Sequence, residues 1–293
     1  MASPSLAYQF KTANIAIKLI VINVAVFLLF NLIPWIIQID NVVLTQWFFL
    51  PSDLGSFITQ PWGLLTYNFL HRDVWHLLWN MLYLYIFSRF ILNLFTDKRL
   101  LTVYLLGGMV GGLLFVAAYN LLPAFQGKGY LIGASAAVNA IIVFIAAYTP
   151  HQTIRIIMFN VKLWHIAAVL VLIDLLSLPT SGNAGGLMAH LGGAAFGYIY
   201  AKQLAKGNDI GEWFERIMDS VASMFSGKPK EKKSRMRTVH RNTKAPSKPT
   251  AKKTEGKSAQ QQQIDAILDK ISKSGYESLS KAEKDFLFKA GKD

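Results

Sequence analysis

Six apolar stretches occupy most of the first 205 residues, and each is close to the length that a helix needs to cross a membrane. Such a helix takes about 20 mostly apolar residues. The fourth and fifth stretches are shorter, which fits helices enclosed by other helices. The stretches lie at about residues 15–37, 75–94, 100–122, 131–148, 163–178 and 186–204. The sequence therefore predicts an all-α membrane protein with a six-transmembrane-helix bundle.

The composition agrees with a membrane protein. Only 16% of the residues are charged, against about 25% in a typical soluble protein. The first apolar stretch is too long for a signal-peptide core and no small-residue cleavage site follows it, so we expect it to be retained. Cysteine is absent, which excludes disulfides, thiolate metal sites and a cysteine nucleophile.

Basic residues predict how the bundle is oriented. They gather at the two termini and in the connections after the second and fourth stretches, whereas the other three connections hold only Arg72 and Lys128. By the positive-inside rule both termini are cytoplasmic, and an even number of spans requires them to share a side. We expect a multi-pass protein of a bacterial inner (plasma) membrane.

The chain divides into four parts. Residues 1–206 form the predicted six-helix membrane domain, in which residues 40–72 make a long amphipathic first loop with aromatic anchors. Residues 207–226 have the spacing of an amphipathic juxtamembrane helix on the cytoplasmic surface. Residues 227–260 form a basic linker that is expected to be disordered, and residues 261–293 a small cytoplasmic helical hairpin.

The basic linker holds twelve Lys and Arg against two Glu between residues 227 and 257. A solvated linker is the simpler interpretation, and attraction to anionic membrane lipid is the functional alternative. No nucleic acid is expected, because no aromatic residues interleave with the charges. The terminal hairpin is typical of a docking or oligomerisation module for a cytoplasmic partner that the sequence does not identify.

Polar side chains within predicted spans mark function, because they are costly there. His76 and Asn80 lie in the first turns of the second helix, Ser135 one turn into the fourth, and His190 one turn into the sixth. These three helices all run inward from the outer face. The topology alone therefore brings the four side chains to one level near the outer surface.

The chemistry that these residues permit is nucleophilic catalysis. A serine needs a base, usually histidine, to become a nucleophile, and the oxyanion that forms needs hydrogen-bond donors, which His76, Asn80 and the Ser135 N–H can supply. Gly133 and Gly193 allow the serine and histidine helices to approach. No third carboxylate is evident at this depth, so the pattern predicts a dyad.

Simpler interpretations exist for each residue alone. A lone intramembrane serine usually bonds its own backbone, and a lone histidine is as often structural. Asp174, about one turn from the outer end of the fifth helix, is expected to have a structural role, and His71 to face a loop or interface. The histidines lack acidic partners at ligand spacing, so we expect no metal and no cofactor.

Three motifs together resemble those of the rhomboid intramembrane proteases. They are H-x-x-x-N from His76 to Asn80, Gly133-Ala134-Ser135, and Ala189-His190-Leu191-Gly192-Gly193, in family order. The resemblance covers about residues 15–205 and implies the six-helix rhomboid fold, with Ser135 as nucleophile and His190 as general base. It also implies transmembrane protein substrates that are cut in or beside the membrane.

Two departures from the family pattern affect the site itself. Ala136 stands where the family usually has glycine, and its methyl group is expected to crowd the oxyanion pocket. Asn139 replaces an aromatic residue and is expected to hydrogen-bond His190. These departures favour the alternative function, a catalytically inactive rhomboid-like protein that binds transmembrane helices. A transporter or channel would need charges deep in the bundle or broken helices, and the sequence shows neither.

Overall fold

The computed structural model describes residues 5–226 and 259–290. The chain forms two compact units, Met1–Lys230 and Glu231–Asp293, and the described residues of both are mostly helical. The basic linker expected at residues 227–260 lies almost wholly outside the described residues.

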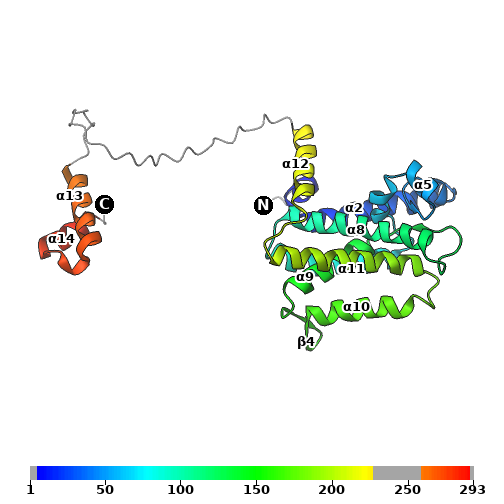
Figure 1. Cartoon of the computed structure of the whole chain (residues 1–293). Helices are drawn as coiled ribbons and strands as arrows, with labels where there is room; N and C mark the ends of the chain where they lie inside the picture. The colour runs from blue at the N-terminus through cyan, green and yellow to red at the C-terminus, as the bar shows by residue number, and fades with distance from the viewer. Residues whose placement is uncertain (1–4, 227–258, 291–293) are drawn as a thin grey trace, which may run out of the picture. The chain divides into compact units, whose positions relative to one another are not determined.

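Helices stand at all six positions where the sequence predicts them (Figure 1). The first is interrupted by a turn of π-helix, η1 (Leu28–Leu32), directly before Pro34, whose ring cannot continue regular helical bonding. The six are α2 (Ile15–Phe27) continued through η1 into α3 (Ile33–Ile36), α7 (Val74–Leu92), α8 (Asp97–Leu121), α9 (Ser135–Tyr148), α10 (Leu163–Ser177) and α11 (Ala184–Ala205).

Helix α9 is the centre of the bundle. It packs against α7, α8, α10 and α11, and nearly all of its residues from Ala136 to Ala146 are buried. Its 14 residues rise about 21 Å, less than the roughly 30 Å of a hydrocarbon core. Its short length matches the prediction of a helix enclosed by others.

By length and composition, only two of the described helices qualify as membrane spans, Ile15–Ile36 and Asp97–Leu121, while α9 and α10 are shorter apolar helices. The polar side chains and glycines that distinguish α7 and α11 lower their hydropathy. The fold is therefore established as mostly helical, and the crossing of all six helices remains a prediction.

The fourth helix begins later than the sequence suggests. The prediction started it at about residue 131, but Leu131 pairs with Leu50 where β2 (Tyr130–Leu131) meets β1 (Leu50–Pro51) in antiparallel register. Gly133 follows with a φ of 120°, a value that an α-helix does not permit. Ser135 is consequently the first residue of α9, one turn nearer the helix end than predicted.

Glycines bring α8, α9 and α11 into close contact. Gly193 of α11 lies against the carbonyl oxygen of Ala136, and Gly197 against that of Ala140. A methyl group at Gly111 of α8 would lie 2.6 Å from the Ala136 side chain. Backbone contacts of this kind set the positions of the first turns of α9 and the middle of α11.

The predicted first loop folds into short elements. Thr66 and Trp62 tie it together by donating hydrogen bonds to the carbonyl oxygens of Phe48 and Trp47, both at 2.7 Å. The elements are α4 (Val42–Thr45), β1, α5 (Leu54–Thr59), α6 (Gly63–Thr66) and η2 (Tyr67–Phe69), preceded by α1 (Leu6–Thr12) near the N-terminus.

At the opposite end of the bundle lie a β-hairpin, which the sequence did not suggest, and the predicted amphipathic helix. The hairpin pairs β3 (Thr153–Ile156) with β4 (Phe159–Lys162) between α9 and α10. Helix α12 (Glu212–Ser226) is held to α8 by Arg99, which contacts Asp209 at 2.5 Å and Glu215 at 2.8 Å. The apolar face of α12 is left exposed.

The second unit consists of α13 (Ala259–Ser274), η3 (Tyr276–Ser278) and α14 (Lys281–Ala290). Ile267 and Leu279 are buried between its helices, and Lys270 donates to both carboxylate oxygens of Glu283 at 2.9 and 3.0 Å. This arrangement has the form of the helical hairpin that the sequence predicts.

Candidate active site

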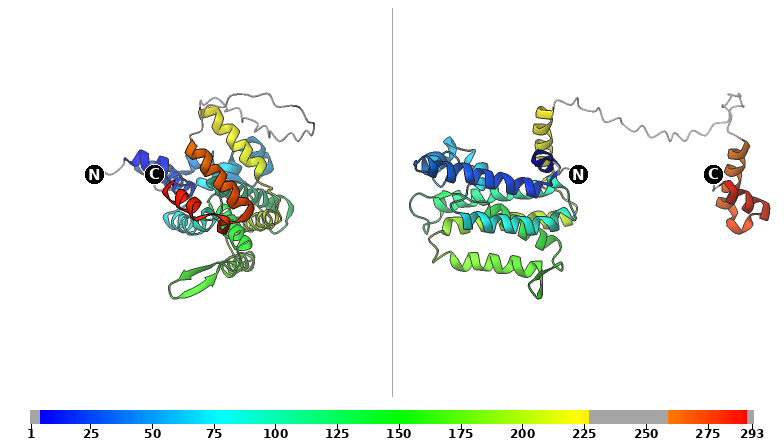
Figure 2. Two further views of the ribbon diagram at one scale, coloured as in Figure 1. Left: turned by 90° about the vertical axis from the view of Figure 1, so that its left-hand side faces the viewer. Right: turned by 180° about the vertical axis from the view of Figure 1, so that it is seen from behind.

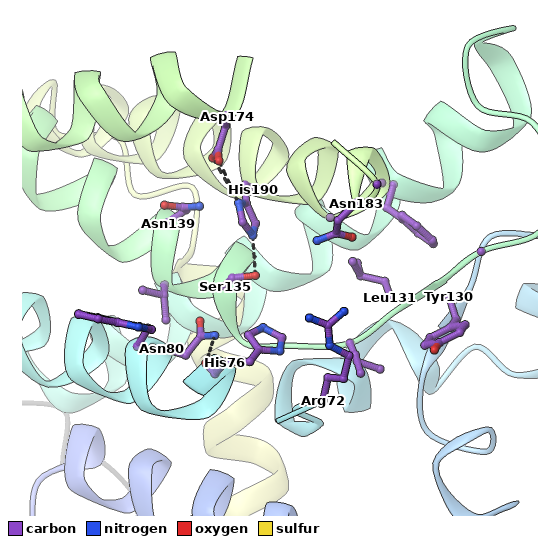
Figure 3. Close-up of a pocket in the computed structure, with 18 of the residues that line it drawn as sticks. Arg72, His76, Asn80, Tyr130, Leu131, Ser135, Asn139, Asp174, Asn183 and His190 are labelled. Carbon is purple, nitrogen blue, oxygen red and sulfur yellow. Dashed lines mark hydrogen bonds and ion pairs between the residues drawn. The ribbon is translucent and has the colours of Figure 1, made fainter. Parts of the chain in front are cut away.

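The hydroxyl of Ser135 and the imidazole of His190 lie within hydrogen-bonding distance. Ser135 Oγ is 2.7 Å from His190 Nε2 (Figure 3). The serine comes from the first turn of α9 and the histidine from α11, and the close packing of Ala136 on Gly193 brings these two backbones together. The structure thus joins two residues that are 55 positions apart in the sequence.

A carboxylate occupies the other side of the imidazole. Asp174 of α10 places both oxygens 3.3 Å from His190 Nδ1. The side chains are 14% exposed for Asp174 and 21% for His190, so water screens the contact only in part. Ser135, His190 and Asp174 form one chain of polar groups drawn from three helices (Figure 3).

The expectation that no carboxylate lies at this depth was therefore wrong. Helix α10 runs in the opposite direction to α9 and α11, and Asp174 lies three residues before its last residue, Ser177. Helices α9 and α11 begin at the end of the bundle where α10 finishes, so the first turns of both helices lie near the level of Asp174. The sequence placed Asp174 one turn from the outer end, and comparing that depth with the depth of Ser135 would have put a carboxylate at the level of the site, though not against His190.

Asn139 does not bond His190, contrary to the expectation. Both ring nitrogens of His190 already face other groups, Ser135 on one side and Asp174 on the other. Asn139 lies one turn beyond Ser135 on α9 and lines the same cleft.

Ala136 does not crowd the cleft. Its side chain points toward Gly111 of α8, it is 1% exposed, and it is not among the residues that line the cleft. The methyl group that replaces the usual glycine therefore fills space between two helices, away from the nucleophile.

His76 and Asn80 face Ser135 from α7. Asp73 caps this helix by accepting the His76 backbone N–H at 2.9 Å, and the Asn80 amide donates to the His76 carbonyl oxygen at 2.8 Å. A methyl group at Gly133 would come within 2.6 Å of the His76 ring. The imidazole therefore lies directly against the turn that leads into Ser135.

His71 faces the loop that leads into Ser135, and its support of the site is a role that sequence reasoning did not give it. It is 3% exposed, its ring lies edge-on to that of His76 at 5.0 Å, and its Nε2 accepts the Ala134 N–H at 3.5 Å. Burial, followed by the proximity of His76, lowers the pKa of His71 to about 3. A neutral His71 thus supports the segment that carries the nucleophile.

An open cleft of about 810 Å³ is lined by Ser135, His190, Asp174, His76 and Asn80. Charged and amide side chains (Arg72, Asp73, Lys128 and Asn183) share its wall with aromatic rings. The cleft has room for an extended peptide segment beside Ser135. The aromatic lining consists of Trp75, Trp79, Tyr83, Phe115, Tyr119 and Tyr130.

In the part of the chain that the structure describes, no group of three or more histidine or acidic side chains is arranged to hold a metal ion. The chemistry described below uses side chains and backbone groups alone.

Comparison with known proteins gives two family matches. Residues 59–207 match the family described as "Rhomboid domain", and residues 252–289 match a family of unknown function, DUF6576. The first match extends from α5 to the end of α11 and contains every residue of the site.

Curated relatives are similar over the same region. The chain is 28% identical over 207 residues to RHOMBOID-like protein 12, mitochondrial, of Arabidopsis thaliana, covering 66% of this chain and 59% of the relative. It is 26% identical over 201 residues to Rhomboid protein 1, mitochondrial, of Saccharomyces cerevisiae, covering 67% and 56%. A third relative, Presenilin-associated rhomboid-like protein A, mitochondrial, of Danio rerio, is 29% identical over 136 residues, covering 45% and 35%.

The matches thus span little more than half the length of the first two relatives. All three carry mitochondrial names, so they give no support to the bacterial type or the bacterial membrane expected from the sequence. The match to the rhomboid domain covers just over half of the 293 residues, from the first loop to the last helix of the bundle. This chain therefore belongs to the rhomboid family of integral membrane proteins.

Proposed function

We propose that this rhomboid is an intramembrane serine endopeptidase whose nucleophile is Ser135 and whose general base is His190. The observation that carries the proposal is the continuous chain from Ser135 Oγ through both nitrogens of His190 to Asp174. A lone serine or histidine has many structural uses, but this order of groups is the one that activates a hydroxyl.

The reaction begins with attack of Ser135 Oγ on a peptide carbonyl carbon, as His190 Nε2 takes the hydroxyl proton. Asp174 accepts the Nδ1–H, which leaves Nε2 free as the base and stabilises the positive charge that develops on the ring. The tetrahedral intermediate collapses when the C–N bond breaks and the leaving amine takes the proton from His190. Water then attacks the acyl-enzyme with His190 as base, and Ser135 is released.

The oxyanion would be held from the α7 side and by the helix that carries the serine. His76 and Asn80 line the cleft opposite Ser135. The backbone N–H of Ser135 is the first of α9, and it belongs to the donors that a helix leaves without intrahelical partners. A helix N-terminus also favours negative charge.

We also propose that all six long helices cross the membrane, with both termini on the side where the basic residues gather. That side is the cytoplasm in the bacterial plasma membrane expected from the sequence. The catalytic groups then lie near the opposite face, within reach of water. Substrates are transmembrane segments of other proteins, and the apolar surroundings of the cleft suit such chains.

The test is cleavage of a reporter transmembrane segment by the purified chain in lipid vesicles. Ser135→Ala and His190→Ala are each expected to abolish cleavage, while Ser181→Ala, a serine outside the cleft, leaves it unchanged. A fluorophosphonate probe should label the wild type and Asn139→Leu but not Ser135→Ala.

If no reporter is cut and Ser135 is not labelled, the proposal fails. Retained binding of the reporter helix in that case would assign the chain to the non-catalytic helix-binding class.

A further inference from the structure

The β3–β4 hairpin has one polar and one apolar face. In its register, Thr153 pairs with Lys162 and Arg155 with Asn160, whereas Ile154 pairs with Val161 and Ile156 with Phe159. Paired residues point to the same side of a two-stranded sheet, and the side alternates along each strand. All four polar residues therefore share one face and all four apolar residues share the other.

The apolar face continues from the protein interior to the tip. Ile154 packs against the core of the bundle. Farther out, the side chains of Ile156 and Phe159 are 46% and 71% exposed, and the turn residues Ile157 and Met158 are 88% and 76% exposed. An apolar surface that begins in the core thus extends outward, and none of the residues that the structure describes covers its end.

The turn keeps this apolar tip in spite of an unfavourable backbone conformation. Ile157 has a φ of 54°, in the left-handed region where a β-branched residue is strained. Two-residue hairpin turns ordinarily carry glycine, asparagine or aspartate at such positions. Strain of this kind persists where the side chain has a use that outweighs it, and the exposed tip is the feature that Ile157 supplies.

The hairpin lies across the direction of the bundle. Seen along the helices in Figure 2, it projects sideways past α10. It follows the last turn of α9, so it lies at the opposite end of that helix from Ser135. In a bundle that crosses the membrane, a sideways projection at the bundle end runs along the membrane surface.

We propose that the hairpin is a lipid anchor. Its apolar face and tip enter the boundary between headgroups and acyl chains. Arg155 and Lys162, on the polar face, pair with the phosphates of anionic lipids. The arrangement is the β-hairpin equivalent of an amphipathic helix lying in the interface, with basic residues attracted to a negative leaflet surface.

A lipid surface fits this feature better than a second copy of the chain. Helix α10 follows the hairpin directly and also exposes apolar side chains, Val169 and Leu172 among them, which face lipid in a crossing helix. A stable protein interface buries about 800 Å² per partner, far more than four side chains at a turn provide. The anchor also secures the start of α10, the helix that carries Asp174.

The absence of cysteine allows a direct test on the full chain. Met158→Cys at the tip and Thr153→Cys at the base are each labelled with an environment-sensitive fluorophore and reconstituted into phosphatidylcholine vesicles with and without phosphatidylglycerol. A nitroxide on a lipid reports contact with acyl chains, and aqueous iodide reports contact with water. Leu172→Cys serves as the lipid-facing reference.

The lipid quencher is expected to reduce the Met158 signal several-fold more than the Thr153 signal, and iodide to do the reverse. Arg155→Gln combined with Lys162→Gln should lower lipid quenching at the tip only in vesicles that contain phosphatidylglycerol. In detergent, Ile157→Gly should raise the melting temperature by relieving the turn, and in vesicles it should reduce lipid contact at residue 158.

Either of two results would overturn the anchor. Quenching of the tip by iodide alone would place it in water. Protection from both quenchers would place it against protein, in which case a second copy or another protein covers it.

Discussion

Removal of the Asp174 carboxylate is the perturbation that most directly separates a three-residue catalytic chain from a dyad. Asp174→Ala leaves Ser135 and His190 in place and removes only the acceptor of the Nδ1–H. The imidazole then loses the group that fixes its tautomer and stabilises its positive charge. We expect kcat to fall while KM stays near the wild-type value, because Asp174 acts through His190 and not on the substrate.

The size of the effect follows from the geometry. A hydrogen bond to a charged group contributes about 1.5–3 kcal/mol, and each 1.36 kcal/mol changes a rate about tenfold. The expected loss is therefore about 10- to 10²-fold. Charge-assisted hydrogen bonds are usually 2.7–2.9 Å long, whereas the distance between Asp174 and His190 is 3.3 Å. We therefore do not expect kcat to fall by about 10⁴, the loss that the aspartate-to-asparagine change causes in serine proteases with a full triad.

The assay is cleavage of a reporter transmembrane segment in vesicles, with kcat and KM measured separately. Asn139→Leu is the matched control, since Asn139 lines the same cleft without bonding His190, and its rate should stay within about threefold of wild type. Groups that act as a unit lose activity non-additively, so Asp174→Ala combined with His190→Ala should be no slower than His190→Ala alone.

Thermal unfolding in detergent checks that each variant is folded. If folded Asp174→Ala keeps its rate within about threefold of wild type, the carboxylate has no part in the reaction and the dyad predicted from the sequence is restored.

Three further predictions follow from the same site. Asn80→Ala should lower kcat by about 10²–10³, the cost of one oxyanion donor, in the same cleavage assay. Gly133→Ala should lower the free energy of unfolding by more than about 1 kcal/mol, because the φ of Gly133 is positive. It should also slow cleavage, because the added methyl group meets an imidazole of α7. The control Gly182→Ala, at a position with open space around it, should have neither effect. Burial lowers the pKa of His71 to about 3 from its ordinary 6.5. At pH values between these two, the unfolded chain therefore binds more protons than the folded chain. The free energy of unfolding should fall by about 1.4 kcal/mol per pH unit as the pH drops below 6.5. Thermal unfolding at pH 7.5, 6 and 5 should show a slope that is smaller by about this amount in His71→Gln than in wild type and His151→Gln. An equal slope in all three would contradict the assignment.

The sequence predicted the helices and the four polar residues because both depend on local or one-dimensional information. Apolar length marks a membrane helix wherever it lies in the chain. Alternating helix direction then fixes which ends share a face, so Ser135 and His190 could be expected at one level before any packing was known. The helices of the structure agree with these predictions to within a few residues at most of their ends.

The start of α9 could not be found in this way. The residues from 131 to 134 are apolar or small and suit a helix as well as a strand. The helix begins only after these residues, because Leu131 pairs with Leu50 and the backbone of Gly133 is not helical. Such a contact joins segments 81 residues apart, and nothing in the local sequence reports it. The same reason applies to His71, whose burial depends on the packing of the first loop against Ala134.

What the sequence by itself determined is therefore the class of the protein, the number of its long helices, and the identity of a serine and a histidine at one depth. What only the tertiary structure decided is which side chains touch. Asp174 rather than Asn139 meets His190, and Ala136 faces Gly111 rather than the cleft. The depth of a side chain along a helix follows from its residue number. The rotation of the helix about its axis and its distance from other helices are set by packing against neighbours. This rotation and this distance determine which side chains come into contact.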